Sequence, residues 1–151
     1  MVIEILKELY NRDLGKLRDE IAAYENEDAI WKTGGAITNS AGNLCLHLVG
    51  NLNAFIAAEL GGSGYVRNRD LEFSDKGVPR AELLSKVDNT ISAVAQALEK
   101  VVPDDLSKEY PKVVFSGPMT TGHFLIHLTT HLSYHLGQIN YHRRLFDSGV
   151  K

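Results

Sequence analysis

Four long segments of the chain place apolar side chains three or four residues apart, the spacing that gathers them on one face of an α-helix. In the first segment these residues are Ile3, Leu6, Tyr10, Leu14, Leu17, Ile21 and Tyr24. In the third segment, which begins at Val78-Pro79, they are Leu84, Val87, Ile91, Val94, Leu98 and Val101. Such faces are stable only when they are buried against one another, so the sequence predicts an all-α fold.

The other two helical segments have recognisable limits. The second begins at the helix-capping residues of "TNSAGN" and ends at Gly61-Gly62, because glycine tolerates the backbone conformation that often ends a helix. The fourth is predicted to begin at Thr120 or Thr121 and to extend to about Phe146.

Three connections join these helices, over residues 25–38, 61–78 and 102–119. Loops in helix bundles usually have about 2 to 8 residues, so the last two connections are long. We interpret residues 61–78 as a crossover that lets the helices on either side run parallel. Four helices with a long crossover make a four-helix bundle, and a chain of this length is expected to form a single domain, residues 1–151.

Composition and charge narrow the range of functions. The formal net charge is −3, which gives no electrostatic reason to expect a nucleic acid or an anionic membrane as partner. The start of the sequence does not resemble a signal peptide, and no apolar run approaches the roughly 18 to 20 residues of a membrane span. The single cysteine, Cys45, cannot form an internal disulfide, which suits a reducing compartment. We therefore expect a soluble, cytoplasmic protein.

The fourth helix carries a ladder of histidines within "HFLIHLTTHLSYHLGQI". Four of the six histidines in the chain stand four residues apart: His123, His127, His131 and His135. A stride of four drifts by about 40° around the helix, so the ladder turns through about 120°. Relative to the mean direction of the apolar side chains, His135 and His131 lie nearest, at about 45° and 85°. His127 flanks the apolar face, and His123 is expected to face water.

Two histidines one turn apart on an inward face can bind one divalent metal ion, or they can form a hydrogen-bonded pair at the edge of the core. A metal ion needs at least one more ligand. His142 lies about 10 Å along the axis from His135, which is too far to share the ion. His47 is then the candidate by elimination, although its flank position on the second helix is weak support and carboxylates are alternatives.

Other catalytic patterns are incomplete. The stretch "HLTTH" has the histidine spacing of a zinc protease helix, but Leu128 replaces the glutamate that would act as the general base. The Glu-x-x-His spacing of a di-iron site does not occur, and "GGSG" lacks the lysine of a phosphate-binding loop. Cys45 lies on the apolar side of its helix and is expected to pack as a small hydrophobic residue.

The stretch "NLCLHLVGNLNAF" in the second helix, together with "HLTTHLSYHLGQI" in the fourth, resembles the DinB/YfiT-like superfamily of metalloenzymes. The resemblance covers essentially the whole chain, including "YVRNRDLEF" and "VPRAELL". It implies a four-helix bundle of up-down-down-up topology with long crossover connections, often found as a homodimer. It also implies a divalent metal, usually nickel or zinc, held by three histidines that correspond here to His47, His131 and His135. Leu136 stands where arginine is common in the family.

Members of this superfamily with assigned chemistry include S-transferases that use the thiols bacillithiol or mycothiol. By resemblance, we expect a metal-dependent enzyme that activates a thiol or water for attack on a small electrophile, as an S-transferase or a hydrolase. A low-molecular-weight thiol would be its cosubstrate. The alternative is a non-catalytic, stress-related bundle that a metal stabilises or that binds a small ligand. No residue is identified as catalytic.

Several polar residues are expected near the metal or at the rim of a substrate site. Gln138, His127 and Asn43 are candidates to contact the ligands or the substrate, and ordinary solvated helix positions are the alternative for them. The crossover contributes charges that either face a substrate or are solvated: Arg67, Arg69, Asp70 and Glu72. Trp31 is expected to anchor the first connection onto the bundle, and His123 and His142 are expected at the surface or at its boundary.

Overall fold

The structure, a computed structural model, describes residues 1–147, and within that range it contains helices and no strand. The α-helices are α1 (Val2–Ala22), α2 (Ala41–Leu52), α3 (Arg69–Ser74), α4 (Arg80–Glu99) and α5 (Thr121–Phe146). Three shorter helical elements accompany them: η1 (Glu27–Trp31), η2 (Asn53–Ala58) and η3 (Pro103–Ser107). The predicted all-α fold is therefore confirmed.

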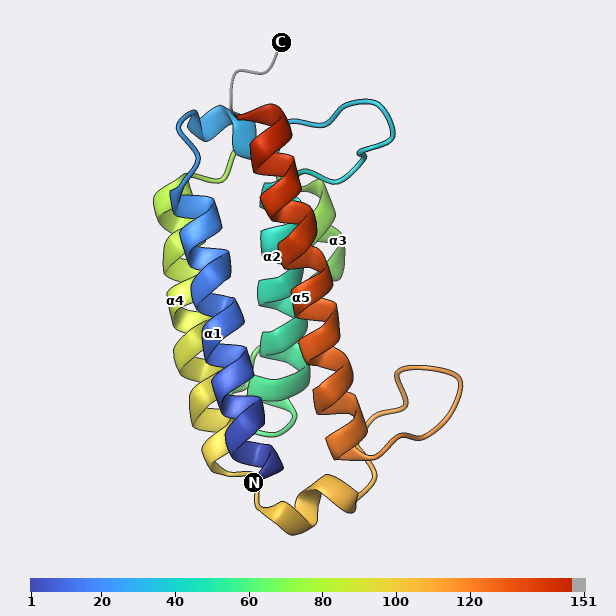
Figure 1. Ribbon diagram of the computed structural model, residues 1–151. Coiled ribbons are helices and arrows are strands. Elements are labelled where there is room, and N and C mark those ends of the chain that lie inside the picture. Colours follow the sequence, from blue (N-terminus) through green and yellow to red (C-terminus); the bar gives the residue numbers. More distant parts are fainter. Residues whose placement is uncertain (148–151) are drawn as a thin grey trace.

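Helices α1, α2, α4 and α5 lie side by side, and the short helix α3 packs on α2 (Figure 1). Helix α1 packs against α4 and α5, and α2 packs against the same two helices. The segment between α2 and α4 passes back along the molecule and includes α3, which packs against α2. The core lies between the long helices, where the predicted stripe of α1 is buried in full: Ile3, Leu6, Tyr10, Leu14, Leu17, Ile21 and Tyr24.

Helix α2 is the most enclosed element. Its N-cap is Ser40, whose hydroxyl accepts a hydrogen bond from the backbone N–H of Asn43 at 3.1 Å. All 12 of its residues are buried, because α3, α4 and α5 surround it. The expectation that no apolar run approaches the length of a membrane span is wrong for Ala41–Ala58, which is long and apolar enough by length and composition, with a mean hydropathy of 1.2. However, 78% of this stretch is buried inside the molecule. Its composition is thus that of a core helix.

Two details of the predicted helices are wrong. Pro79 is the N-cap of α4 rather than its first residue, since the helix begins at Arg80. Leu83 is fully buried, whereas the predicted core residue Leu84 is only partly buried. The buried face of α4 therefore passes through Leu83, Val87 and Thr90, whose hydroxyl makes Thr90 compatible with burial by donating to the carbonyl of Lys86 at 2.7 Å.

Candidate metal centre

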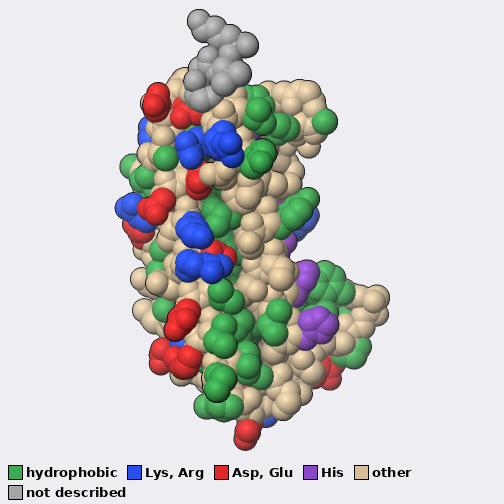
Figure 2. All heavy atoms as spheres, in the orientation of Figure 1, with side chains coloured by type: hydrophobic (Ala, Val, Ile, Leu, Met, Phe, Trp, Pro, Cys, Tyr) green, Lys and Arg blue, Asp and Glu red, His purple; other side chains and the backbone are tan. Residues whose placement is uncertain are grey.

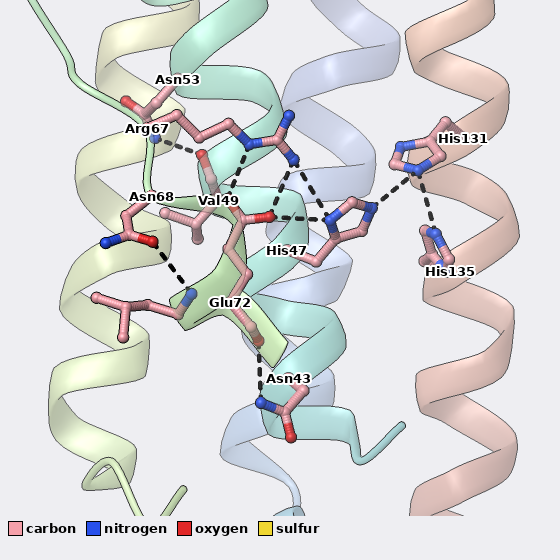
Figure 3. Close-up of polar contacts among 10 residues, drawn as sticks. Asn43, His47, Val49, Asn53, Arg67, Asn68, Glu72, His131 and His135 are labelled. Atoms are coloured by element: carbon pink, nitrogen blue, oxygen red, sulfur yellow. Dashed lines mark hydrogen bonds and ion pairs between the residues drawn. The ribbon is translucent and has the colours of Figure 1, made fainter. Parts of the chain in front are cut away.

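Three histidine side chains from two helices point toward one another (Figure 3). His47 comes from α2, and His131 and His135 come from successive turns of α5. The Nε2 atom of His131 lies 3.2 Å from Nε2 of His47 and 3.1 Å from Nε2 of His135. Two nitrogens bound to one ion at about 2.1 Å would be about 3.0 to 3.4 Å apart, so this spacing suits a single divalent ion.

The ligand atoms of these histidines all lie within 4.8 Å of one another, and no cysteine or carboxylate of the described chain belongs to the group. The structure thus brings together the three histidines named by the sequence. Metal binding by them stays a prediction. Three protein ligands would leave at least one coordination position free, as in catalytic rather than structural zinc sites.

In His47 and His135, a hydrogen bond at Nδ1 determines that the other ring nitrogen, Nε2, is available to an ion. Nδ1 of His47 donates to Oε1 of Glu72 at 3.0 Å, since an ionised carboxylate can only accept. Nδ1 of His135 donates to Oε1 of Gln138 at 2.7 Å. In both rings the proton is therefore on Nδ1, and Nε2 presents a lone pair toward the centre of the group.

His131 supports the same interpretation. Its Nε2 has two close nitrogen neighbours that are both acceptors, so a single proton on this atom can satisfy only one of them. Its Nδ1 is buried and has no hydrogen-bond partner among residues 1–147. Burial and the nearby imidazoles of His135 and His47 lower the pKa of His131 to about 4, so the ring is neutral at pH 7. Burial also lowers the pKa of His135.

Glu72 of α3 links His47 to the crossover. Its side chain is buried, and Arg67 holds it with two hydrogen bonds, from Nε to Oε2 at 2.8 Å and from Nη2 to Oε1 at 2.9 Å. Burial by itself would raise the pKa of Glu72, but the hydrogen bonds from His47 and Arg67 outweigh it and hold the pKa below its usual value. The carboxylate is therefore ionised at neutral pH. Arg67 and Glu72 form an inward-facing pair instead of a solvated rim.

Gly50 of α2 allows the Glu72 carboxylate to lie close to the helix backbone. A Cβ atom at Gly50 of α2 would overlap the carboxylate of Glu72, so any larger residue would displace the carboxylate from α2. The sequence left Glu72 either facing a substrate or solvated, and it did not predict the contact with His47. The signal that was available is a glycine in the middle of a helix, which costs about 1 kcal/mol relative to alanine and often marks a close approach.

The position of His47 differs from its predicted one. It was placed on the flank of its helix, but only 7% of it is exposed. The apolar residues of α2 indicate only its side toward the core. Helix α3 packs on another side of α2 and places the ring of Phe73 5.0 Å from that of His47. A flank position on a helix that is enclosed on all sides is a buried position.

The other predicted residues have different surroundings. Asn43 does not contact the histidines: its side-chain amide donates to the backbone carbonyls of Glu72 and Asp75, at 2.9 and 2.8 Å, and so anchors α3. His127 is outside the group, with its ring 6.5 Å from that of His131. His123 is exposed, as expected. Trp31 packs over Gly42 of α2, which confirms its anchoring role.

His142 was expected at the surface or its boundary, and this was wrong because it is 3% exposed. It lies under the first connection, where Nε2 donates to the carbonyl of Lys32 at 2.8 Å and Nδ1 accepts from the hydroxyl of Tyr24 at 2.7 Å. Burial lowers its pKa, so it is a neutral, fully hydrogen-bonded core histidine.

Comparison with known families gives one match. A family model described as "Protein of unknown function (DUF1572)" matches residues 3–149, which is nearly the whole chain. DUF1572 is a DinB-like family, in agreement with the resemblance carried by the histidine motifs. No curated protein matches the chain.

Proposed function

We propose that this chain, which belongs to the DinB-like family DUF1572, is a divalent-metal-dependent enzyme. It would activate a thiol or water for attack on a small electrophile, as an S-transferase or a hydrolase. The observation that carries the proposal is the convergence of three Nε2 atoms without a fourth protein ligand in the described chain. Structural zinc sites usually have four protein ligands, whereas catalytic sites keep a position for water or substrate.

The residues that would hold the ion are His47, His131 and His135. When bound there, the ion would supply Lewis acidity and so lower the pKa of a thiol or water toward neutrality. Glu72 and Gln138 hold two of the rings in the tautomer that suits a ligand. His131 needs no deprotonation at neutral pH, because its pKa is already lowered to about 4.

The kind of metal and the cosubstrate follow from the resemblance. Imidazole nitrogens suit zinc and nickel equally well, so the ligand set agrees with either ion. A low-molecular-weight thiol as cosubstrate would place the protein in a reducing compartment, the cytoplasm. The resemblance also suggests a homodimer, which light scattering can test: a monomer mass across a broad concentration range would argue against it.

The proposal includes the topology expected for the family, an up-down-down-up four-helix bundle with long crossover connections. The contacts of α1 and α2 with both α4 and α5 support it, as does the return of the crossover along α2. The alternative is a non-catalytic protein in which the metal ion only joins α2 to α5. It is favoured by the origin of the histidines, since His47 comes from α2 and the other two come from α5, which packs against α2.

Two measurements test the enzyme. Protein purified without chelator should contain close to one equivalent of a divalent metal, and His135→Ala should lose it, while His123→Ala on the same helix should keep it. A screen of thiols and electrophiles with the zinc- and nickel-loaded protein should then show a transfer or hydrolysis that His135→Ala lacks. Metal binding without any such activity would favour the structural alternative.

A further inference from the structure

A cavity of about 230 Å³ lies beside the three histidines. His47 and His131 form part of its wall, and the rest comes from Asn51 of α2, η2, the crossover, the first half of α5 and the connection before α5. Figure 2 shows histidine side chains bordering a hollow on the right-hand edge of the molecule. The volume is below the roughly 300 to 1,000 Å³ of pockets for drug-sized ligands, so the cavity suits a small molecule.

One wall of the cavity is aromatic. Phe55 and Phe124 meet edge to face with ring centroids 5.2 Å apart, and the ring of His127 stacks on Phe124 at 6.1 Å. Phe115, half exposed on the connection before α5, closes this wall by packing edge-on against His127 at 4.9 Å. Such a wall favours an apolar body, and a flat ring most of all.

The charge at the mouth is positive. Arg67 and Arg69 are part of the lining, which contains no carboxylate. The charge of Arg67 is matched by Glu72, but Arg69 lies over the ring of Phe73 at 5.2 Å and has no ion-pair partner among residues 1–147. A ligand anion would therefore gain a charge-assisted hydrogen bond from Arg69 without displacing a protein carboxylate.

A buried polar group also points to a ligand. Asn51 lines the cavity and is 6% exposed, yet its Oδ1 atom has no hydrogen-bond partner in the described chain. Buried polar atoms of native proteins are nearly always paired, so an unpaired one indicates a partner that the protein itself does not supply. Oδ1 of Asn51 can accept a hydrogen bond from an N–H or O–H group of a molecule that enters between the aromatic wall and the histidines.

We propose that this cavity binds the substrate, and that the substrate is a small organic carboxylate with an apolar, preferably aromatic, body. Its carboxylate pairs with Arg69, its body lies against Phe55, Phe115 and Phe124, and a separate hydroxyl or N–H group donates to Oδ1 of Asn51. An aromatic wall can also bind an organic cation, but two arginines at the same cavity oppose that occupant. That the bound molecule is a substrate rests on the proposed function, but its binding does not require the metal.

Binding of three matched probes tests the charge preference: phenylacetate, phenylacetamide and phenethylammonium, measured by two-dimensional NMR on chelator-treated protein. Phenylacetate should bind most tightly and should shift the resonances of Phe115 and of the Arg69 side chain. Arg69→Gln should weaken phenylacetate about tenfold, because a hydrogen bond to a charged group contributes about 1.5 kcal/mol or more. Arg12→Gln, an exposed arginine on α1, is the matched control and should leave affinity unchanged.

Equal affinities for the three probes, tighter binding of phenethylammonium, or no effect of Arg69→Gln would each overturn the proposal. Phe115→Ala gives a second check, since its half-exposed ring can be removed without opening the core, and it should weaken all three probes alike. Metal uptake is measured separately, on the same preparation incubated with zinc or nickel instead of chelator. Phenylacetate binding by a protein that takes up no metal would support the proposed cavity and contradict the proposed metal-dependent function. Metal uptake by a protein that does not bind phenylacetate would contradict the proposed cavity and support the metal centre.

Discussion

Which nitrogen of His47 faces the other histidines is decided by a residue 25 positions away in the sequence. Glu72 accepts from Nδ1 at 3.0 Å, and it is itself held by Arg67. Arg67 Nη2 also lies 3.4 Å from Nδ1, but a guanidinium can only donate, so it can pair with Nδ1 only in the other tautomer of His47. Without the carboxylate, Nδ1 would have no acceptor in this network, and the other tautomer would become accessible.

We therefore predict that Glu72→Ala weakens metal binding about 10- to 100-fold, the usual effect of losing the partner of a ligand histidine. Competition with a chromophoric zinc chelator measures this affinity directly. Asp70→Asn, on the same short helix but exposed, is the matched control and should bind zinc as the unmodified protein does.

A second readout separates positioning from a general loss of structure. In ¹⁵N-labelled, metal-free protein, the His47 ring should be mainly protonated at Nδ1, and Glu72→Ala should shift it toward the Nε2-protonated form. Unchanged zinc affinity together with an unchanged tautomer would show that Glu72 only fastens the crossover.

Among the elements, α5 was the most predictable and α3 the least. The limits of α5 and the inward direction of His131 and His135 followed from one helix's own periodicity. Helix α3 has six residues, and its buried residue is the charged Glu72, so no apolar pattern could reveal it. The burial of His47 depends on α3 and was missed for the same reason. Residue patterns within a helix report one interface, whereas the site is made where three elements meet.

The contact between α2 and α3 gives a prediction about glycine. Gly50→Ala should bind zinc more weakly than the unmodified protein, because the added methyl group displaces the Glu72 carboxylate. It should also fail to gain the stability of about 1 kcal/mol that alanine normally gives over glycine inside a helix. Gly15→Ala is the matched control, since a Cβ there meets nothing within 4 Å. Urea unfolding should show Gly15→Ala to be more stable and Gly50→Ala not.

A Gly50→Ala protein with full zinc affinity and the full gain in stability would mean that Glu72 can move away without consequence. In that case the glycine would be there for the helix contact alone, and the network from Arg67 to His47 would not support the ion.

For the whole molecule, the sequence predicted the helical class because four apolar stripes require mutual burial. It did not by itself predict which helices neighbour one another, since long connections permit several orders. The three-histidine ligand set came from the family resemblance. Its geometry has a consequence for the stability of the whole fold. An ion at this centre would join α2 to α5, whose histidines lie 84 positions apart in the sequence at His47 and His131.

Metal binding should accordingly stabilise the whole fold. An ion that binds only the folded chain, at a free concentration 100 times its dissociation constant, adds about 2.7 kcal/mol. For a chain of this size that raises Tm by about 5 to 10 °C. Differential scanning fluorimetry with zinc or nickel, before and after chelation, should show this shift for the unmodified protein and for His123→Ala. His47→Ala should not show it, because removing the α2 ligand leaves both remaining histidines on α5. An equal shift in His47→Ala would place the ion elsewhere, since a pair on one helix cannot tie that helix to another.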